Sequence, residues 1–500
     1  MKQSFSSRLP GLLITALLTV ALTLFMAILV QTKLLPGKLL LLAGGIFLLF
    51  VFSVCMLTRN SSHTGSMIVG SLMSVVVLVV LMIGTPYLTK AVNALGNMTG
   101  VNVEVADVGI YVKKDSSTQQ LSELSNKNVG ILEVLDRENS DKVVKDIQNE
   151  VGSLNVKHYA GISDLVDGLM DGQTDAILLN NAYLDLLVEM EGYENATDWM
   201  REIHTQKTET IIQNAQNNKK PNWNIKDLFG SNEEEASASG DRVFTMYISG
   251  IDNRGGLIAK SRSDVNILAT VNVDTRQVLL VSTPRDYYVP LALNGEPLDK
   301  LTHAGIYGVD VSMGTLEKLY NTDIDYYFRV NFSGFEKIID ALGGVTVHND
   351  IAFSSAHGNY YFQEGDIQMD GAAALAFARE RYAFKNEGDR KRGENQMAVI
   401  KAVINKAMSP AILTSYAQLM ESVAGNFETS MPYDVIAELV RDMLDNGGSW
   451  NIVSASVNGS DASRVPYSMN QAVYVMIPNQ ETVDAVSAKM AQVRNGEILN

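Results

Sequence analysis

The chain has 500 residues, of which 46% are hydrophobic, so it is long enough for more than one packed domain. Its formal net charge of -16 excludes attraction of nucleic acid to the surface as a whole, so any anion site must be a local basic cluster. The single cysteine, Cys55, excludes an intrachain disulfide and a zinc or redox site built on a CxxC pair.

Three long apolar stretches open the chain, at residues 10–31, 39–58 and 67–88, and none contains a charged residue. Each is long enough to cross a hydrocarbon core of ~30 Å as a helix. A secretory signal peptide would account for the first stretch alone. Helices that pack on a soluble core are usually apolar along one stripe, whereas these stretches are apolar on all sides. We therefore expect residues 1–95 to form a membrane anchor with three transmembrane helices in the lipid bilayer.

The orientation of this anchor does not follow from its flanking charges. The basic residues beside the three stretches are divided evenly between the two sides, so the positive-inside rule gives no answer. An odd number of spans nevertheless places the N-terminus and the long C-terminal region on opposite sides of the membrane.

Residues 98–213 alternate short β-branched runs, such as TDAILLNNA, with amphipathic segments such as SDKVVKDIQNEV. This alternation predicts a small α/β domain, here called the accessory domain. Ser140 and Ser163 each stand beside an aspartate where a helix N-cap is expected. No catalytic constellation is evident in this domain. The polar segment at residues 214–240 predicts a linker.

Residues 241–500 predict a second, larger α/β domain, because apolar runs again precede helical segments. The run YISGID delivers Asp252 into a glycine-rich turn. Arg262 and Asp264 have the same parity at the start of the next strand, so we expect them to share a face. Two carboxylates and an arginine would then converge, and carboxylate oxygens suit Mg²⁺. The alternative is that Asp264 merely pairs with Arg262 at a solvated strand edge.

Arg285 and Asp286 follow a later strand, in the run STPRDYYV. Ligands of open α/β sheets bind at the carboxyl ends of strands, so this pair lies at a candidate ligand-binding edge.

The strongest signal is a basic cluster in an otherwise acidic chain, made of Arg379, Arg381, Arg390, Lys391 and Arg392. Arg392 and Gln396 are four residues apart and would share one face of a helix. Guanidinium forks match paired phosphate oxygens, so a diphosphate is the natural ligand. Two alternatives stay open: a solvated basic face paired with nearby acidic residues, and binding of a nucleic-acid backbone.

Residues 243–404 resemble the catalytic domain of the LytR-CpsA-Psr family. The motifs that carry this resemblance are Asp252, RSD at 262–264, SxPRD at 282–286, KLTHAGIYG at 300–308, NFSGFEKIIDALGGV at 331–345, the stretch that ends in Arg379 and Arg381, and a D-x-x-R-x-x-R-Q pattern with Asp389, Arg392 and Gln396. Asn395 stands where this pattern usually has a second arginine. The three spans and the accessory domain resemble the streptococcal capsule-associated branch.

The resemblance implies a fold with a central mixed sheet in residues 241–500. It also implies a transferase that moves a glycopolymer, capsular polysaccharide in this branch, from a polyprenyl-diphosphate carrier to peptidoglycan. By the same resemblance Asp252 and Asp264 would hold Mg²⁺. The residues that would bind the diphosphate are Arg262, Arg285, Arg379, Arg381, Arg392 and Gln396. The residues that would act in catalysis are Arg262, Arg285 and Asp389, with Asp286 as an alternative to Asp389 for taking up a proton.

The acceptor lies outside the cell membrane, so the resemblance implies a multi-pass protein with a cytoplasmic N-terminus and with the residues after about 90 outside the cell. Capsule assembly proteins are further candidate partners, and nucleic acid is not expected. Two other functions stay open: a membrane regulatory protein of capsule expression, of the transcriptional attenuator type, and a lipid diphosphate hydrolase.

Overall fold

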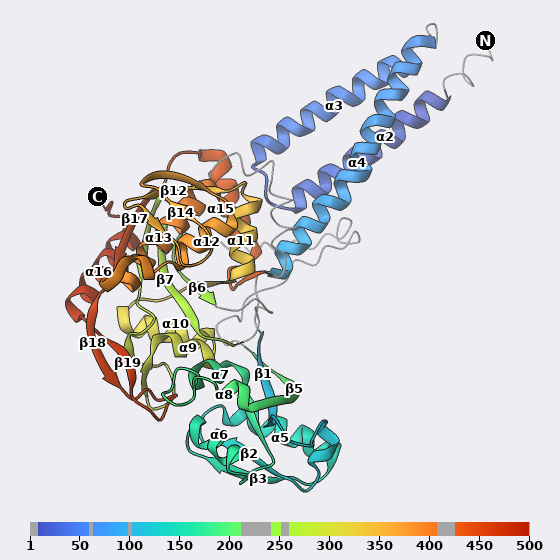
Figure 1. The fold of residues 1–500 in the computed structure, drawn as a ribbon. Coiled ribbons are helices and arrows are strands. Elements are labelled where there is room, and N and C mark those ends of the chain that lie inside the picture. The colour runs from blue at the N-terminus through green and yellow to red at the C-terminus, as the bar shows by residue number, and fades with distance from the viewer. Residues whose placement is uncertain are drawn as a thin grey trace.

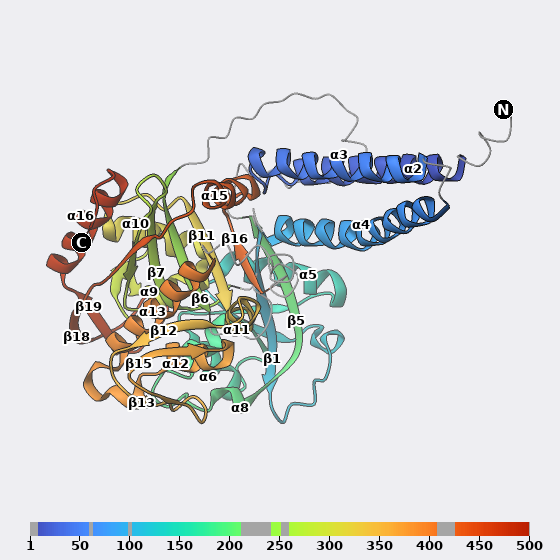
Figure 2. The ribbon, with the colours of Figure 1, turned by 90° about the horizontal axis from the view of Figure 1, so that it is seen from above.

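The structure is a computed structural model that describes residues 9–59, 64–98, 103–211, 242–251, 260–407 and 426–499. It has three parts: a helical anchor, the accessory domain and a larger domain, here called the catalytic domain (Figure 1). The anchor helices run side by side and extend away from the two domains (Figure 2). The predicted linker at residues 214–240 lies outside the described residues.

The anchor consists of α2 (Leu9–Gln31), α3 (Gly37–Arg59) and α4 (Thr64–Met98). By length and composition, all three helices are apolar enough to cross a membrane. Their apolar side chains are widely exposed, with Leu41 at 79%, and such surface is favourable in hydrocarbon but not in water. The prediction of three long apolar helices at the N-terminus is confirmed.

The accessory domain contains a five-stranded sheet in the order β3-β2-β4-β1-β5. Its strands are β1 (Val103–Lys113), β2 (Asn128–Leu132), β3 (Asn155–Tyr159), β4 (Ala176–Asn180) and β5 (Met200–Ile211). Its helices are α5 (Arg137–Val151), α6 (Ile162–Met170), α7 (Leu184–Leu187) and α8 (Ala196–Trp199), with short 3-10 turns at Leu121–Leu124 and Asn181–Tyr183.

Two local expectations for this domain are wrong. Ser140 and Ser163 are not N-caps, because α5 already begins at Arg137 and α6 at Ile162. The amide of Ser140 donates to the carbonyl of Asp136 at 3.0 Å and so lies inside the helix. Strand β5 was not expected, because its sequence MREIHTQKTETI is mostly polar. It is an edge strand that pairs with β1, where polar side chains are tolerated.

The catalytic domain is built on a six-stranded sheet in the order β16-β11-β6-β7-β8-β17. These strands are β6 (Val243–Ile251), β7 (Ser263–Asn272), β8 (Gln277–Ser282), β11 (Tyr326–Asn331), β16 (Phe427–Thr429) and β17 (Asn451–Ser456). Separate two-stranded ladders pair β9 (Tyr288–Pro290) with β10 (Leu298–Lys300), β12 (Val345–Asn349) with β15 (Gly365–Met369), β13 (Phe353–Ser354) with β14 (Tyr361–Phe362), and β18 (Gly459–Arg464) with β19 (Val473–Pro478). The helices are α9 (Leu301–Tyr307), α10 (Val309–Tyr320), α11 (Phe332–Ala341), α12 (Gly371–Arg379), α13 (Gly388–Ala407), α15 (Tyr433–Asn446) and α16 (Gln480–Arg494), with a 3-10 helix η5 (Tyr382–Glu387).

The sheet is mixed, which confirms the predicted α/β class. Strands β6 and β11 are parallel, as are β8 and β17, whereas β7 is antiparallel to both of its neighbours. The carboxyl ends of β6, β8 and β11 therefore meet the start of β7 at one edge of the sheet. The functional side chains described below come from this edge.

Both faces of the sheet are covered by helices. Along β7, Leu268 packs into a core with residues of α9, α10 and α16, whereas Ile267 and Ala269 pack into a second core with residues of α13 and α15. Successive side chains of a strand point to opposite faces, so a strand buried on both faces is apolar at nearly every position. This explains why runs such as VNILATVNV stand out in the sequence.

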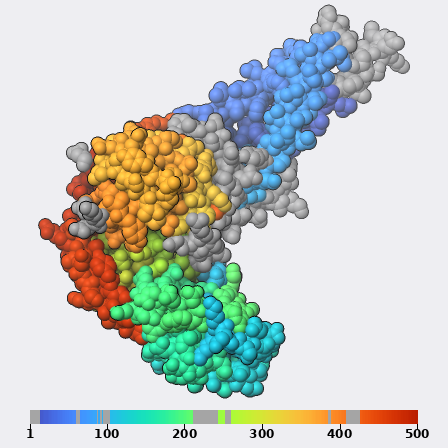
Figure 3. Space-filling view, in the orientation of Figure 1, coloured from blue at the N-terminus to red at the C-terminus, as the bar shows by residue number. Residues whose placement is uncertain are grey.

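A buried ion triad joins the accessory domain to the central sheet. Arg329 of β11 donates to Glu104 of β1 at 2.6 Å and also contacts Glu428 of β16. All three residues are buried, with at most 3% of their surface exposed. The accessory domain also lies against the segment before β19, where Asn470 donates to Ser163 at 2.6 Å (Figure 3). The two domains therefore share an interface with polar contacts.

The anchor also contacts the catalytic domain. The hydroxyl of Tyr433 in α15 donates to the carbonyl of Thr32 at 2.7 Å, and Lys33 lies 3.3 Å from Asp434. Leu34 and Leu88 pack with apolar residues of α11, α15 and β16. The turn between α2 and α3 and the C-terminal part of α4 thus lie beside the catalytic domain.

Candidate active site

The residues of the site are held by element ends that meet at the sheet edge. Asp264 is the second residue of β7, and Arg285 follows the end of β8. At the end of β11, Asn331 caps α11, and its side-chain oxygen accepts from the amide of Gly334 at 2.8 Å. A Cβ atom on Gly334 would lie 1.9 Å from the carbonyl oxygen of Asn426, so only glycine allows this close approach.

An apolar cavity of about 400 Å³ lies between β6, β11 and helices α11, α12 and α13. Most of its wall is aliphatic or aromatic, with Ile248, Phe328, Phe335, Ile338, Ile400 and Val403 among the lining residues. Its polar lining includes Asp264, Arg285, Arg379, Arg381, Arg392 and Gln396. The cavity thus combines a hydrocarbon-like interior with a cationic wall.

A second, polar cavity of about 610 Å³ shares part of this wall. The residues that line both cavities are Asp264, Arg285, Arg381, Tyr382, Arg392 and Gln396. The polar cavity continues past Asp286 and Asp389 to the β18–β19 hairpin, where Asp461 and Tyr474 line it. The shared residues, here called the arginine wall, therefore separate an apolar space from a polar one.

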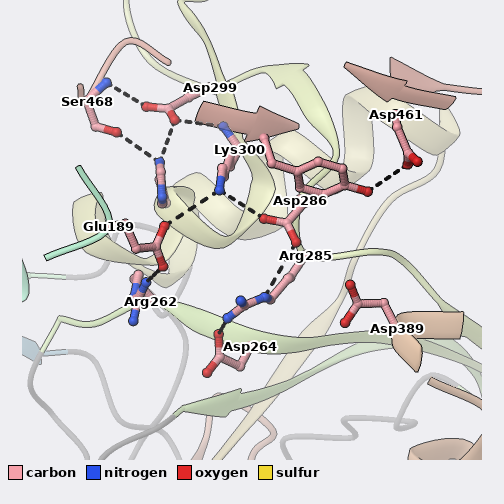
Figure 4. Close-up of polar contacts among 12 residues, drawn as sticks. Glu189, Arg262, Asp264, Arg285, Asp286, Asp299, Lys300, Asp389, Asp461 and Ser468 are labelled. Atoms are coloured by element: carbon pink, nitrogen blue, oxygen red, sulfur yellow. Dashed lines mark hydrogen bonds and ion pairs between the residues drawn. The ribbon is translucent and has the colours of Figure 1, made fainter. Parts of the chain in front are cut away.

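Asp264 and Arg285 form an ion pair within the arginine wall. Arg285 donates to Asp264 at 2.7 Å, and its Nε atom lies 3.6 Å from Asp286 (Figure 4). Burial opposes the charge of Arg285, but Asp264 and Asp286 outweigh it and raise the pKa of Arg285. This arginine is therefore firmly cationic.

The positive charge of Arg392 is less well compensated by neighbouring carboxylates than that of Arg285. Its guanidinium lies 3.1 Å from Asp389, yet burial and the neighbouring charges of Arg285 and Arg381 lower the pKa of Arg392. An arginine stays protonated despite such a shift, so this position holds an excess of positive charge that an anion would stabilise. Gln396, one helical turn later on α13, faces the same two cavities, as its spacing predicted.

Arg379 and Arg381 are held by aromatic rings. Arg379 lies 4.3 Å from the ring centre of Phe332 and lines the apolar cavity. Arg381 lies 4.9 Å from the ring centre of Tyr382, donates to its hydroxyl at 2.9 Å and reaches Asp389 at 3.9 Å. Such stacking fixes the plane of a guanidinium and leaves its edge available to an anion.

The basic cluster divides into two groups. Arg379, Arg381 and Arg392 line the apolar cavity, whereas Lys391 lines neither cavity and pairs with Glu394 at 3.0 Å with 12% of its side chain exposed. Arg390 pairs with Glu394 at 2.7 Å at the rim of the polar cavity. Of these five residues, Arg390 is thus the one with the character of a solvated basic residue, with 53% of its side chain exposed.

Arg262, which was predicted to bind the diphosphate, lines neither cavity and is not part of the arginine wall. It pairs with Glu189, and its other terminal nitrogen lies 3.4 Å from Asp185; both carboxylates belong to α7 and the turn after it in the accessory domain. Figure 4 shows Arg262 beside Glu189, away from the pair of Asp264 and Arg285. In this structure Arg262 and Asp264 therefore have different partners, although they share a parity.

Lys300 lies between Glu189 and Asp286, a residue that lines the polar cavity. It was not among the site residues predicted from the sequence. Its ammonium lies 3.1 Å from Asp286 and 3.6 Å from Glu189, and the residue is only 5% exposed (Figure 4). The only sequence signal for Lys300 was its place in the KLTHAGIYG motif. Asp461, Tyr474 and Glu189 carried no motif at all.

Asn395 points into the domain rather than into a cavity. It is 4% exposed, and its side-chain amide donates to the carbonyl of Phe377 at 3.2 Å. Asn395 therefore lines neither cavity, although its neighbour Gln396 on the same helix lines both.

For the predicted metal site, Asp264 is described but Asp252 lies outside the described residues. Within the described ranges, no group of three or more His, Cys, Asp or Glu residues could hold a metal ion. Asp264 is nevertheless a suitable Mg²⁺ ligand, because Mg²⁺ is often held by one or two carboxylates with phosphate oxygens of the substrate completing its shell. Its position on the wall of both cavities would give such an ion access to a bound diphosphate.

Fold and site together define an α/β protein with a membrane-type anchor and an anion site beside an apolar cavity. A family model described as the LytR_cpsA_psr family matches residues 187–492. The chain belongs to this family, which confirms the resemblance drawn from the motifs. A second model, described as a DNA polymerase processivity factor, matches residues 65–179, a range that takes in parts of both the anchor and the accessory domain.

Similar proteins include three that are named polyisoprenyl-teichoic acid--peptidoglycan teichoic acid transferase TagU. The Bacillus cereus protein is 37% identical over 224 residues, which are 45% of this chain and 71% of the relative. The Enterococcus faecalis protein is 33% identical over 42% of this chain and 69% of its own length. The Bacillus subtilis protein is 32% identical over 42% of this chain and 67% of its own length. Among solved structures, B. subtilis TagV aligns with a TM-score of 0.43 and 25% identity over 51% of this chain and 98% of that one.

Proposed function

We propose that this protein is a transferase that moves a glycopolymer from a polyprenyl-diphosphate carrier to peptidoglycan. The observation that carries the proposal is the arginine wall, which adjoins an apolar cavity on one side and a polar cavity on the other. A polyprenyl diphosphate has the matching chemistry, because a hydrocarbon chain is followed by a compact, multiply charged anion. The names of the TagU relatives support the same donor and acceptor classes.

The donor binds with its polyprenyl chain in the apolar cavity and its diphosphate against Arg285, Arg381 and Arg392. Burial of the chain supplies affinity, at roughly 25 cal/mol per Å² of apolar surface removed from water. Guanidinium groups bind phosphate oxygens through charge-assisted hydrogen bonds and stabilise the charge that develops during transfer. Arg379, between Phe332 and the cavity, is expected to contact the phosphate nearer the lipid.

Mg²⁺ is proposed as the cofactor, with Asp264 and Asp252 as its protein ligands. When bound, the ion would neutralise diphosphate charge and polarise the phosphoryl oxygens. Asp389 is proposed to take the proton of the acceptor hydroxyl. Its carboxylate is held by Arg392 at 3.1 Å and lines the polar cavity, so it can reach a hydroxyl there.

Capsular polysaccharide is proposed as the polymer, because the chain resembles the capsule-associated branch. The orientation in the membrane follows from the position of the acceptor, peptidoglycan, outside the cell. The catalytic domain lies beside the turn between α2 and α3, and the accessory domain is joined to the catalytic domain through the triad of Glu104, Arg329 and Glu428. If both domains face peptidoglycan outside the cell, the start of α2 lies in the cytoplasm. A reporter fused after Asn500 should therefore be active only outside the cell, and activity in the cytoplasm would overturn this orientation.

The decisive experiment uses the purified full chain in detergent, with a polyprenyl-diphosphate saccharide and peptidoglycan. Covalent attachment of the saccharide to peptidoglycan is the expected result. Release of free phosphorylated saccharide without attachment would identify a lipid diphosphate hydrolase instead. Failure to bind the lipid donor at all would exclude both activities and favour a regulatory role.

A further inference from the structure

The part of the polar cavity that the β18–β19 hairpin lines has the chemistry of a saccharide site. Tyr474 of β19 is 44% exposed, and its hydroxyl donates to Asp461 of β18 at 2.8 Å. Both side chains line the cavity, with Asn458 beside them. A partly exposed ring offers a flat apolar face, and a neighbouring carboxylate and amide offer hydrogen bonds. A pyranose, with an apolar face and a rim of hydroxyl groups, is the ligand class that uses both.

The positions of the two cavities on either side of the arginine wall indicate whether this saccharide belongs to the donor or to the acceptor. Phosphoryl transfer requires the attacking and leaving oxygens to lie roughly in line through phosphorus. The leaving group of the proposed reaction is polyprenyl phosphate, whose chain lies on the apolar side of the arginine wall. The attacking hydroxyl must therefore approach from the polar side, which is the side lined by Asp389, Asp461 and Tyr474.

We propose that the polar cavity is the acceptor subsite, and that Tyr474 and Asp461 bind a pyranose of the peptidoglycan glycan strand there. This inference rests on the proposed function and deepens it, because it places the second substrate. The volume of about 610 Å³ lies in the usual range for small-molecule sites and is large enough for a sugar unit.

The reaction balances without a further reactant. The acceptor hydroxyl oxygen forms a bond to the phosphorus that carries the glycopolymer. The bond from that phosphorus to the bridging oxygen breaks, and the electron pair leaves with polyprenyl phosphate. The hydroxyl proton passes to Asp389, on the same side of the arginine wall as the acceptor.

The test measures donor and acceptor separately in the full chain. Tyr474→Ala and Asp461→Asn should each raise the KM for a soluble peptidoglycan glycan fragment by about tenfold. The KM for the lipid donor should stay unchanged, because neither side chain belongs to the arginine wall. Tyr474→Phe, which keeps the ring but loses the hydrogen bond to Asp461, should have a smaller effect than Tyr474→Ala.

Tyr361→Ala is the matched control, since Tyr361 is 70% exposed and lines neither cavity. An equal rise in the acceptor KM for this control, or no rise for Tyr474→Ala and Asp461→Asn, would overturn the proposal. A rise in the donor KM alone would show that the cavity holds the donor saccharide and would equally overturn it.

A binding measurement separates this inference from the proposed function. Titration of the wild-type chain with the same glycan fragment, without any donor, should show binding that Tyr474→Ala weakens by about tenfold. If no transfer is seen but this binding is present, the acceptor subsite stands and the transferase proposal fails. If transfer is seen and Tyr474→Ala leaves glycan binding intact, the transferase stands and the subsite is excluded.

Discussion

Glu189 of the accessory domain forms an ion pair with Arg262 of the catalytic domain and also lies 3.6 Å from Lys300. Asp185 adds a second carboxylate 3.4 Å from Arg262. Two acidic groups from one domain thus compensate cations that flank the anion site of the other. The accessory domain is therefore part of the electrostatic environment of the site, although it holds no catalytic constellation among its described residues.

Replacing Glu189 by glutamine should strengthen binding of the lipid diphosphate donor. The change removes one negative charge near the anion and releases part of the positive charge of Arg262 and Lys300. We expect a decrease in donor Kd of about threefold to tenfold at low ionic strength, with a smaller effect at high salt. Donor binding to the full chain in detergent, measured across a salt series, gives this value.

Glu191→Gln is the control for this prediction, because it makes the same chemical change two residues away on an exposed side chain that has no ion pair with Arg262 or Lys300. It should leave the donor Kd unchanged. If Glu189→Gln weakened donor binding instead, the pair with Arg262 would be a support of the site rather than a competitor for it.

Removal of the Arg381 side chain should weaken donor binding by about tenfold to a hundredfold, since a charge-assisted hydrogen bond contributes about 1.5–3 kcal/mol. The thermal stability should change little, because the side-chain partners of Arg381 among the described residues are the exposed Tyr382 and, at 3.9 Å, Asp389. Arg494→Ala is a suitable control: this arginine pairs with Asp325 at 3.3 Å near the opposite end of β6. Equal losses for Arg381→Ala and Arg494→Ala would mean that Arg381 acts only through the fold.

A bulkier side chain in the apolar cavity should discriminate between donors by chain length. Val403 lines the cavity from α13, so Val403→Phe would fill part of its volume of about 400 Å³, in which the polyprenyl chain is proposed to bind. We expect weaker binding of a long-chain donor and unchanged binding of a short-chain analogue. Lys401→Phe, at an exposed position of the same helix, should affect neither donor. Equal weakening of both donors by Val403→Phe would place the lipid elsewhere.

Much of the site could be predicted because its residues follow local rules. Arg392 and Gln396 are one helical turn apart, and Arg285 stands at a strand end, so spacing and strand order alone bring them to one edge. The α/β class followed from strands that are apolar on both faces. These features depend on neighbours in the chain and on the pairing of strands, which leave clear patterns in a sequence.

The contacts of Arg262 and Tyr474 could not be predicted in the same way. The partner of Arg262 belongs to another domain, and its choice depends on how two surfaces dock rather than on any local period. Tyr474 and Asp461 face each other across a hairpin whose strands are short and largely polar, and no motif marks either residue. Asn395 occupies a motif position but points inward, because α13 turns that side toward α12.

The buried triad of Glu104, Arg329 and Glu428 should make stability depend on pH. One arginine serves two glutamates, so the buried group carries a net negative charge when both glutamates are ionised. The pKa of Glu428 is raised to about 7, because burial and then the charge of Glu104 raise it by more than Arg329 lowers it. The folded protein therefore binds a proton at Glu428 more tightly than the unfolded chain does.

This difference has a definite sign. Stability from the protonated Glu428 is fully present below the unfolded pKa and is lost as the pH rises through about 7, a loss of at most about 3 kcal/mol. Glu428→Gln resembles the protonated form, so its melting temperature should fall less than that of the wild type between about pH 5 and about pH 8. Thermal unfolding of both full chains in detergent measures this, with the exposed Glu481→Gln as control. If the melting temperatures of the wild type and of Glu428→Gln fall in parallel over this pH range, Glu428 is ionised throughout and the triad does not titrate.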